Sequence, residues 1–194
     1  MGLSPELVLA IEYVTHVLFV LLAYGILRLS GTPGPVLRPF PQVRRLKSFG
    51  LLAALIVIVQ VLTSSPVSSS GESPFSYGIG FVAAQLAFQG VFVGWTEEYL
   101  FRGSIQRVLN SRWGQDGVAK RWVKKGTLVA ALIFGAAHLT NLGFGQALMV
   151  TEVQALTAFV GGLICGIYFD AKDDFAAIAW LHNIVDVIPL LLLY

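Results

Sequence analysis

Long apolar runs, separated by short polar or charged stretches, dominate the sequence. Several of them approach the roughly 20 residues that a helix needs to cross the hydrocarbon core of a bilayer. The second and fourth runs are shorter, so their helices are expected to tilt or to extend past the apolar window. The pattern predicts an all-α, polytopic transmembrane helix bundle of about six spans. The six windows are 7–29, 49–63, 75–95, 127–141, 146–169 and 175–194.

Composition strengthens this interpretation. Of the 194 residues, 56% are hydrophobic and only 12% are charged, which is too apolar for a soluble domain of this size. The lipid bilayer is therefore the expected environment. The net charge of +2 is small and its basic residues fall in a few clusters, so no nucleic-acid partner is expected. No Lys or Arg precedes the first apolar run, which predicts a retained helix and not a cleaved signal peptide.

The connections between windows differ in charge, and this difference predicts the topology. The first connection carries Arg38, Arg44, Arg45 and Lys47, whereas residues 64–74 contain no Lys or Arg. Because basic connections stay in the cytoplasm, the first connection should be cytoplasmic and the second external. A third connection, with seven basic residues between 102 and 125, returns to the cytoplasmic side, and Trp113 and Trp122 suit the headgroup boundary there.

Continuing this alternation places the turn at 138–146 outside and the acidic turn at 170–174 inside. With six spans both termini lie outside, as in a multi-pass protein of the cell (plasma) membrane. We expect two parts in the chain. Residues 1–70 would hold two N-terminal transmembrane helices with a basic cytoplasmic loop, and residues 71–194 would form the functional membrane core.

Ionisable residues inside apolar runs are the strongest functional signal, because each costs several kcal/mol in hydrocarbon unless it faces protein or water. The first cluster is Glu97, Glu98 and Arg102, at the end of the third run. Glu98 and Arg102 are four residues apart, with the acid first, which favours a side-chain pair on a helix. Glu97 is turned by about 100° from Glu98. This predicts that Glu97 is the less neutralised acid, free to act as a general base.

Two further clusters supply histidines. Phe134 and His138 share a helix face, beside small residues that allow close helix packing. His182 and Asp186 also lie one turn apart, where an Asp can hold the imidazole in one tautomer. Taken singly, each cluster is also compatible with a structural role; together they favour one common site.

Two other features are interpreted as structural. Glu12 and His16 form a further pair four residues apart, which we interpret as a structural pair or a membrane-boundary position. Cys165 is the only cysteine, which excludes an internal disulfide, and it is expected to be a small buried hydrophobe.

Three motifs in this order resemble a known family, the CAAX proteases and bacteriocin-processing enzymes, which includes the type II CAAX prenyl endopeptidases. They are Glu97-Glu98-x-x-x-Arg102, Phe134-x-x-x-His138 and His182-x-x-x-Asp186. The resemblance covers about residues 75–194 and leaves the first two windows outside. It implies an intramembrane endopeptidase that hydrolyses membrane-associated or prenylated (CAAX-type) peptide and protein substrates, without a cofactor or metal.

By the same resemblance, Glu97 and His138 would activate the attacking water, and His182 with Asp186 would stabilise the oxyanion. Glu98 and Arg102 would hold the geometry and charge of the first motif. The family's last position is Asn or Asp, and an ionised Asp only accepts hydrogen bonds. Asp186 is therefore either protonated or an orienting partner of His182.

Two alternatives to this function stay open. Glu97, His138 and His182 offer two histidines and a carboxylate to a zinc ion, although the chain lacks a His-Glu-x-x-His pair on one helix. A non-catalytic membrane immunity or scaffolding protein, which binds a partner through its helices or basic loop, is the second alternative.

Overall fold

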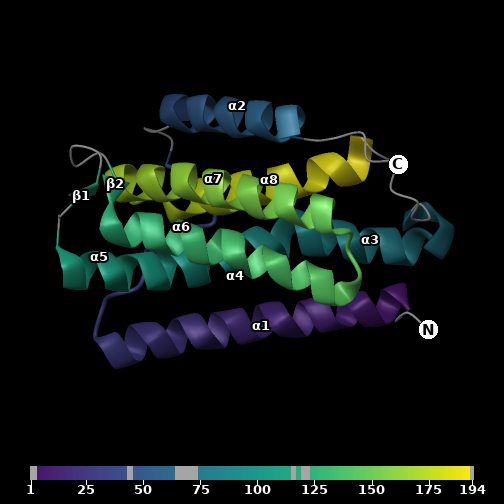
Figure 1. Ribbon diagram of the computed structural model, residues 1–194, viewed down its shortest axis with the longest axis horizontal. Coiled ribbons are helices and arrows are strands. Elements are labelled where there is room, and N and C mark those ends of the chain that lie inside the picture. The colour runs from purple at the N-terminus through teal and green to yellow at the C-terminus, as the bar shows by residue number, and fades with distance from the viewer. Residues whose placement is uncertain (1–3, 43–45, 64–73, 115–116, 119–122, 193–194) are drawn as a thin grey trace.

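A computed structural model describes residues 4–42, 46–63, 74–114, 117–118 and 123–192. Within these ranges the chain is almost entirely helical, and the helices run side by side along the long axis of the molecule (Figure 1). The only described strands are β1 (Gly117–Val118) and β2 (Val123–Lys124), which pair antiparallel over two residues each. The predicted all-α helix bundle is confirmed.

The helices follow the apolar windows closely, with one exception. Their bounds are α1 Pro5–Ser30, α2 Leu46–Thr63, η2 Pro74–Tyr77, α3 Ile79–Ala87, η3 Phe88–Phe92, α4 Val93–Glu98, η4 Tyr99–Gln106, α5 Arg107–Trp113, α6 Lys125–Ala137, η5 His138–Phe144, α7 Leu148–Lys172 and α8 Phe175–Leu192. The segments η3 and η4 are π-helical, and η2 and η5 are 3₁₀ turns.

The exception is the third window, because the helix does not stop at residue 95. It runs without a break through Ile79–Trp113, from α3 to α5. Arg102 and Arg107 therefore lie on a helix and not in a loop. Arg102 pairs with Glu98 inside the bundle, and Arg107 pairs with Asp173 at its exposed end. Arg44, Arg45, Lys120, Arg121 and Trp122, to which the topology prediction also refers, lie outside the described residues.

The long helix Ile79–Trp113 occupies the centre of the bundle. Its α4 and η4 segments contact α1 on one side, while α8 packs against α4 and α6 against η4. The pair α6–α7 lies beyond, and α2 packs outermost, on α7 and α8 (Figure 1). Small residues allow these approaches: a Cβ on Gly135 of α6 would lie 2.8 Å from the Ala155 carbonyl oxygen of α7. The predicted close packing at Gly135 is thus confirmed.

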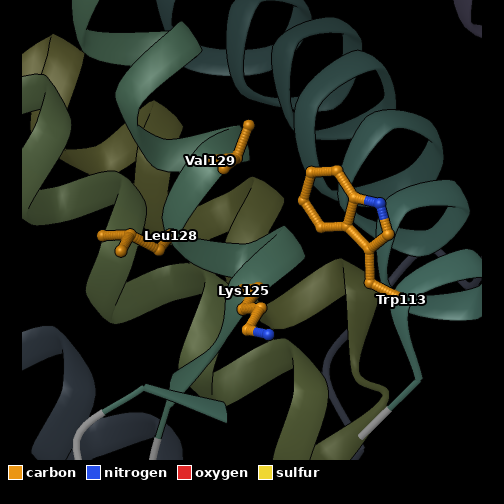
Figure 2. Close-up of a pocket in the computed structure, with 4 residues that line it drawn as sticks. All are labelled: Trp113, Lys125, Leu128 and Val129. Carbon is orange, nitrogen blue, oxygen red and sulfur yellow. The ribbon is translucent and has the colours of Figure 1, made fainter. Parts of the chain in front are cut away.

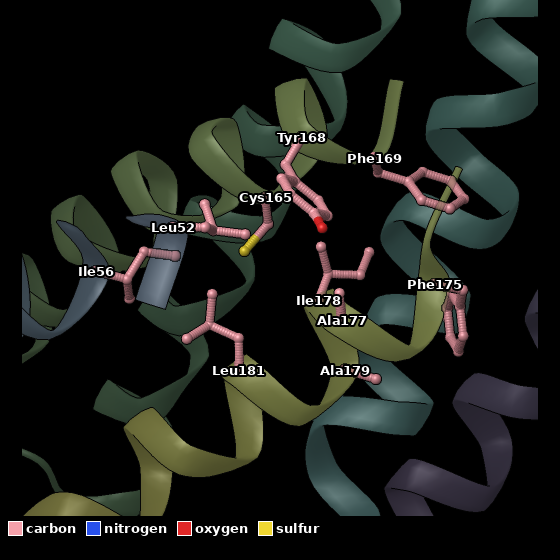
Figure 3. Close-up of a cluster of buried hydrophobic side chains, with 10 residues drawn as sticks. All are labelled: Leu52, Ile56, Cys165, Tyr168, Phe169, Phe175, Ala177, Ile178, Ala179 and Leu181. Atoms are coloured by element: carbon pink, nitrogen blue, oxygen red, sulfur yellow. The ribbon is translucent and has the colours of Figure 1, made fainter. Parts of the chain in front are cut away.

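The largest buried apolar cluster joins α2, α7 and α8. Leu52 and Ile56 of α2 face Cys165 of α7 and Leu181 of α8 (Figure 3). All four side chains are buried, including the single cysteine, as the sequence predicted. Apart from the Cys165 thiol and the Tyr168 hydroxyl, the buried members of this cluster are apolar, so the described buried side chains of α2, Leu52 and Ile56, dock by apolar packing.

Charged side chains mark one end of the bundle. Arg107 of α5 forms an ion pair with Asp173, and the Lys124 ammonium lies 3.4 Å from Asp170. The third connection and the 170–174 turn therefore lie on the same side, in agreement with the predicted alternation. The first turn of α1 and the last turn of α8 lie at the opposite end (Figure 1).

Four helices among the described residues are long and apolar enough to cross a membrane: Pro5–Ser30, Ile79–Trp113, Lys125–Phe144 and Leu148–Lys172. Large apolar side chains cover their outer faces, for example Leu21 of α1 (61% exposed) and Leu156 of α7 (63% exposed). Such a surface is stable in lipid and unfavourable in water. The protein is an integral membrane protein, with α2 and α8 as the remaining apolar helices of the bundle.

Candidate active site

The centre of the site is the short segment α4, which carries Thr96, Glu97 and Glu98. It lies between the two π-helical segments η3 and η4. π-Helical turns widen a helix locally and occur frequently at functional sites, because they redirect side chains and free backbone groups. The two acids thus lie in a short α-helical segment with a π-helical turn on either side.

Glu98 and Arg102 form the buried ionic core of the site. The Arg102 Nη1 donates to Glu98 Oε1 at 3.0 Å, and both side chains are only 1% exposed. The guanidinium also lies over the ring of Phe134, 4.2 Å from its centroid. This confirms the predicted pairing of Arg102 with Glu98 and not Glu97. A buried pair of this kind stabilises only while both partners remain, since either charge alone is costly to bury.

His182 of α8 connects this ionic core to the second acid. Its Nδ1 lies 2.8 Å from Glu98 Oε1, and its Nε2 lies 3.5 Å from both Glu97 Oε2 and Asp186 Oδ2. Because Glu98 Oε1 already accepts from Arg102, we assign the same oxygen as the acceptor for His182, whose Nδ1 then carries the proton. The carboxylate that lies at hydrogen-bond distance from His182 and fixes its tautomer is thus that of Glu98. The sequence reasoning had assigned this role to Asp186.

Glu97 differs from Glu98 in having only histidines as charged partners. Its Oε2 faces His182, and its Oε1 lies 3.7 Å from the Nε2 of His16 on α1. Glu97 Oε2 and Asp186 Oδ2 are both buried and accept no hydrogen bond from the described residues. Two carboxylate oxygens around one imidazole nitrogen retain acceptor capacity for a water or a peptide N–H.

His138 stands at the edge of this group. Its Nδ1 lies 2.9 Å from the Phe134 carbonyl oxygen, so Nδ1 donates and Nε2 is left as the acceptor in the neutral ring. The Phe134 ring packs against both His138 (4.8 Å) and His182 (5.7 Å). His138 makes no ion pair with Glu97 or Glu98. Five of the six predicted site residues are therefore linked by polar contacts, and His138 joins them across Phe134.

Asn183 is a structural residue of the site that the sequence reasoning missed. Its Oδ1 accepts from the Gly94 N–H (2.6 Å), and its Nδ2 donates to the Val91 carbonyl (3.1 Å). A Cβ on Gly94 would lie 2.5 Å from that Oδ1. Asn183 thereby satisfies backbone groups beside η3 and locks α8 onto the long helix. A polar residue directly after His182 was the available signal.

Two further tests of the surroundings are informative. In the described part of the chain, no three His, Cys, Asp or Glu side chains are arranged to hold a metal ion. A hollow of about 450 Å³ lies elsewhere, between Trp113 of α5 and Lys125, Leu128 and Val129 of α6 (Figure 2). Trp113 follows Glu97 by sixteen residues, about 24 Å along the helix axis at a rise of about 1.5 Å per residue, so this hollow is separate from the acids.

The site is thus a buried Glu/His cluster built from several helices of an apolar bundle. The model of the family described as type II CAAX prenyl endopeptidase Rce1-like matches residues 79–188, more than half of the chain. The chain belongs to this family. The match includes all three motifs and excludes α1 and α2. No curated protein and no solved structure matches the chain.

Proposed function

We propose that the protein is an intramembrane endopeptidase of the CAAX type in which Glu97 activates water. The observation that carries the proposal is the unequal environment of the two adjacent acids. Glu98 is neutralised by Arg102 and His182, whereas Glu97 contacts only imidazoles and keeps an unpartnered oxygen. An acid of the second kind is suited to accept a proton from water.

In the proposed reaction, Glu97 removes a proton from a water held between it and His138, and the water oxygen attacks the scissile carbonyl carbon. The carbonyl oxygen becomes an oxyanion, to which the His182 Nε2–H donates; the acids Glu97, Glu98 and Asp186 around the ring favour its protonated form. As the C–N bond breaks, the proton returns from Glu97 to the leaving amine. No covalent intermediate forms.

The proposed roles of the other residues follow from their contacts. Asp186 orients and balances the charge of His182, while Arg102 and Glu98 hold the first motif in place. The proposed substrates are membrane-associated peptides or proteins, including prenylated tails, because lipid-facing helices surround the site. We place the enzyme in the plasma membrane, with residues 71–194 as its catalytic core.

Cleavage by Glu97→Gln in proteoliposomes tests this function. A panel of membrane-reconstituted peptides, with and without prenyl groups, would be incubated with wild type, Glu97→Gln and the control Glu152→Gln, which changes an exposed acid on α7. We expect kcat to fall by at least about 10²-fold in Glu97→Gln only, since proton transfer by a positioned acid is lost. Wild-type activity in Glu97→Gln would overturn the proposal.

A chelator arm in the same experiment addresses the zinc alternative. Glu97-dependent cleavage that survives prolonged chelation supports the metal-free reaction. Cleavage that is lost on chelation and restored by Zn²⁺ would instead assign the motif residues to a metal.

A further inference from the structure

His16 of α1 reaches the site from outside the matched family region. Although α1 is an apolar helix, the His16 side chain points inward and the residue is only 7% exposed. Its Nδ1 lies 2.6 Å from Thr96 Oγ1, and its Nε2 lies 3.7 Å from Glu97 Oε1. The imidazole therefore contacts two consecutive residues of α4. The partner expected from the sequence, Glu12, keeps a buried Oε2 without a hydrogen-bond partner among the described residues.

The hydrogen bonds of Thr96 define the state of the His16 ring. Thr96 Oγ1 lies 3.0 Å from both the Phe92 and Val93 carbonyl oxygens, the back-bond that Thr commonly makes within a helix. Because a hydroxyl has one proton, Oγ1 donates to a carbonyl and accepts from His16 Nδ1–H. This leaves His16 Nε2 facing Glu97, either as a lone pair or, in the imidazolium, as a second N–H.

In both states His16 and Glu97 hold one proton between them. The 3.7 Å between His16 Nε2 and Glu97 Oε1 is too long for a direct hydrogen bond, so a bridging water or a small shift would join them: a neutral His16 then accepts from a protonated Glu97, and a charged His16 donates to an ionised Glu97. Oε1 is thereby fixed toward α1, which turns Oε2 toward His182 and Asp186. We propose that His16 is a positioning residue: anchored by Thr96, it orients the Glu97 carboxylate for the reaction.

The alternative is that His16 is only a packing residue. Its ring lies among those of Phe19, Phe88 and Phe92, with centroids 5.2, 4.9 and 6.3 Å away. The substitution His16→Phe separates the two roles, because it keeps an aromatic ring among these phenylalanine rings and removes both imidazole nitrogens. Tyr13→Phe is the matched control. It removes a different inter-helix hydrogen bond of α1, from the Tyr13 hydroxyl to the Ala84 carbonyl (3.1 Å).

The kinetic test rests on the proposed function. In proteoliposomes we expect His16→Phe to lower kcat by about 10- to 100-fold, as for a misplaced catalytic group, with KM and the unfolding midpoint near wild type. His16→Gln, whose amide retains an N–H for Glu97, should recover part of kcat, and Tyr13→Phe should match wild type. A folded His16→Phe with wild-type kcat would overturn the proposal.

A second measurement decides the inference without any substrate. The chain has three histidines, so the imidazole ¹⁵N signals in detergent micelles are assigned by comparison with His16→Phe. We expect His16 to carry a proton on Nδ1, and its Nε2 signal to shift in Glu97→Gln but not in Glu152→Gln. A His16 Nε2 signal whose chemical shift is unchanged in Glu97→Gln would refute the contact between the two side chains. If that coupling is present while no peptide is cleaved, the positioning holds and the proposed function fails.

Discussion

The two helices outside the matched region, α1 and α2, contrast in what they contribute. Both are predominantly apolar, and they pack on opposite sides of the bundle (Figure 1). The buried face of α1 carries polar groups: His16 meets Thr96 and Glu97, and Tyr13 donates to the Ala84 carbonyl. The buried side chains of α2, Leu52 and Ile56, meet only the apolar cluster of α7 and α8 (Figure 3).

This difference shows that hydropathy alone does not separate a functional helix from an anchoring one. Both helices are strongly hydrophobic, and neither belongs to the three motifs. What distinguishes α1 is polar side chains at inward-facing positions, where the bundle and not lipid surrounds them. The expected division at residue 70 stays a prediction, and we infer that α1 belongs functionally with the core.

The largest effect is expected at the ionic core that both helices flank. Arg102→Met removes the cation and leaves Glu98 buried with His182 as its one charged contact. An uncompensated buried charge should cost about 3–5 kcal/mol of unfolding free energy and abolish cleavage. The measurement is denaturant unfolding in micelles, with Arg112→Met, at an exposed position of α5, as the control. An equally stable Arg102→Met would show that Glu98 is neutralised by another group.

An intermediate effect is expected from separating α8 from the long helix. In Gly94→Ala the new methyl group meets Asn183 Oδ1 and the Ala179 carbonyl oxygen. Overpacking of this kind should cost about 1–3 kcal/mol. The resulting shift of His182 relative to Glu97 should lower kcat by roughly 10²-fold, as displacements near 1 Å do.

The matched control for this prediction is Gly161→Ala on α7, where nothing lies within 4 Å of the added Cβ. Its unfolding midpoint and cleavage rate should both match wild type. If Gly94→Ala were as active as Gly161→Ala, the α4–α8 contact would not set the geometry of the site.

Sequence reasoning succeeded where the relevant geometry lies within one helix. The pairs Glu98–Arg102, Phe134–His138 and His182–Asp186 follow from helical spacing, and all three are in contact. It failed on the length of the third helix, because a hydropathy window stops at charges that are neutralised inside the bundle. It also missed contacts between helices, since the pairing of His182 with Glu98 or His16 with Glu97 depends on tertiary packing, which no local spacing encodes.

The smallest effect on catalysis is expected on the side of α2. Leu52→Ala opens a cavity beside Cys165 and should lower stability by about 2–5 kcal/mol, the range for buried leucines. Because no polar group of the site touches Leu52, the kcat of the folded fraction should stay within about two-fold of wild type, in contrast to His16→Phe on α1.

Cys165 supplies an internal reporter: it is 5% exposed, so a maleimide should label it slowly in wild type and faster in Leu52→Ala. Leu51→Ala, at an exposed position one residue away, should leave labelling unchanged. A Leu52→Ala protein with faster labelling and a kcat reduced as strongly as in His16→Phe would remove the distinction between the two helices, because a purely apolar contact would then control the site as tightly as a polar one.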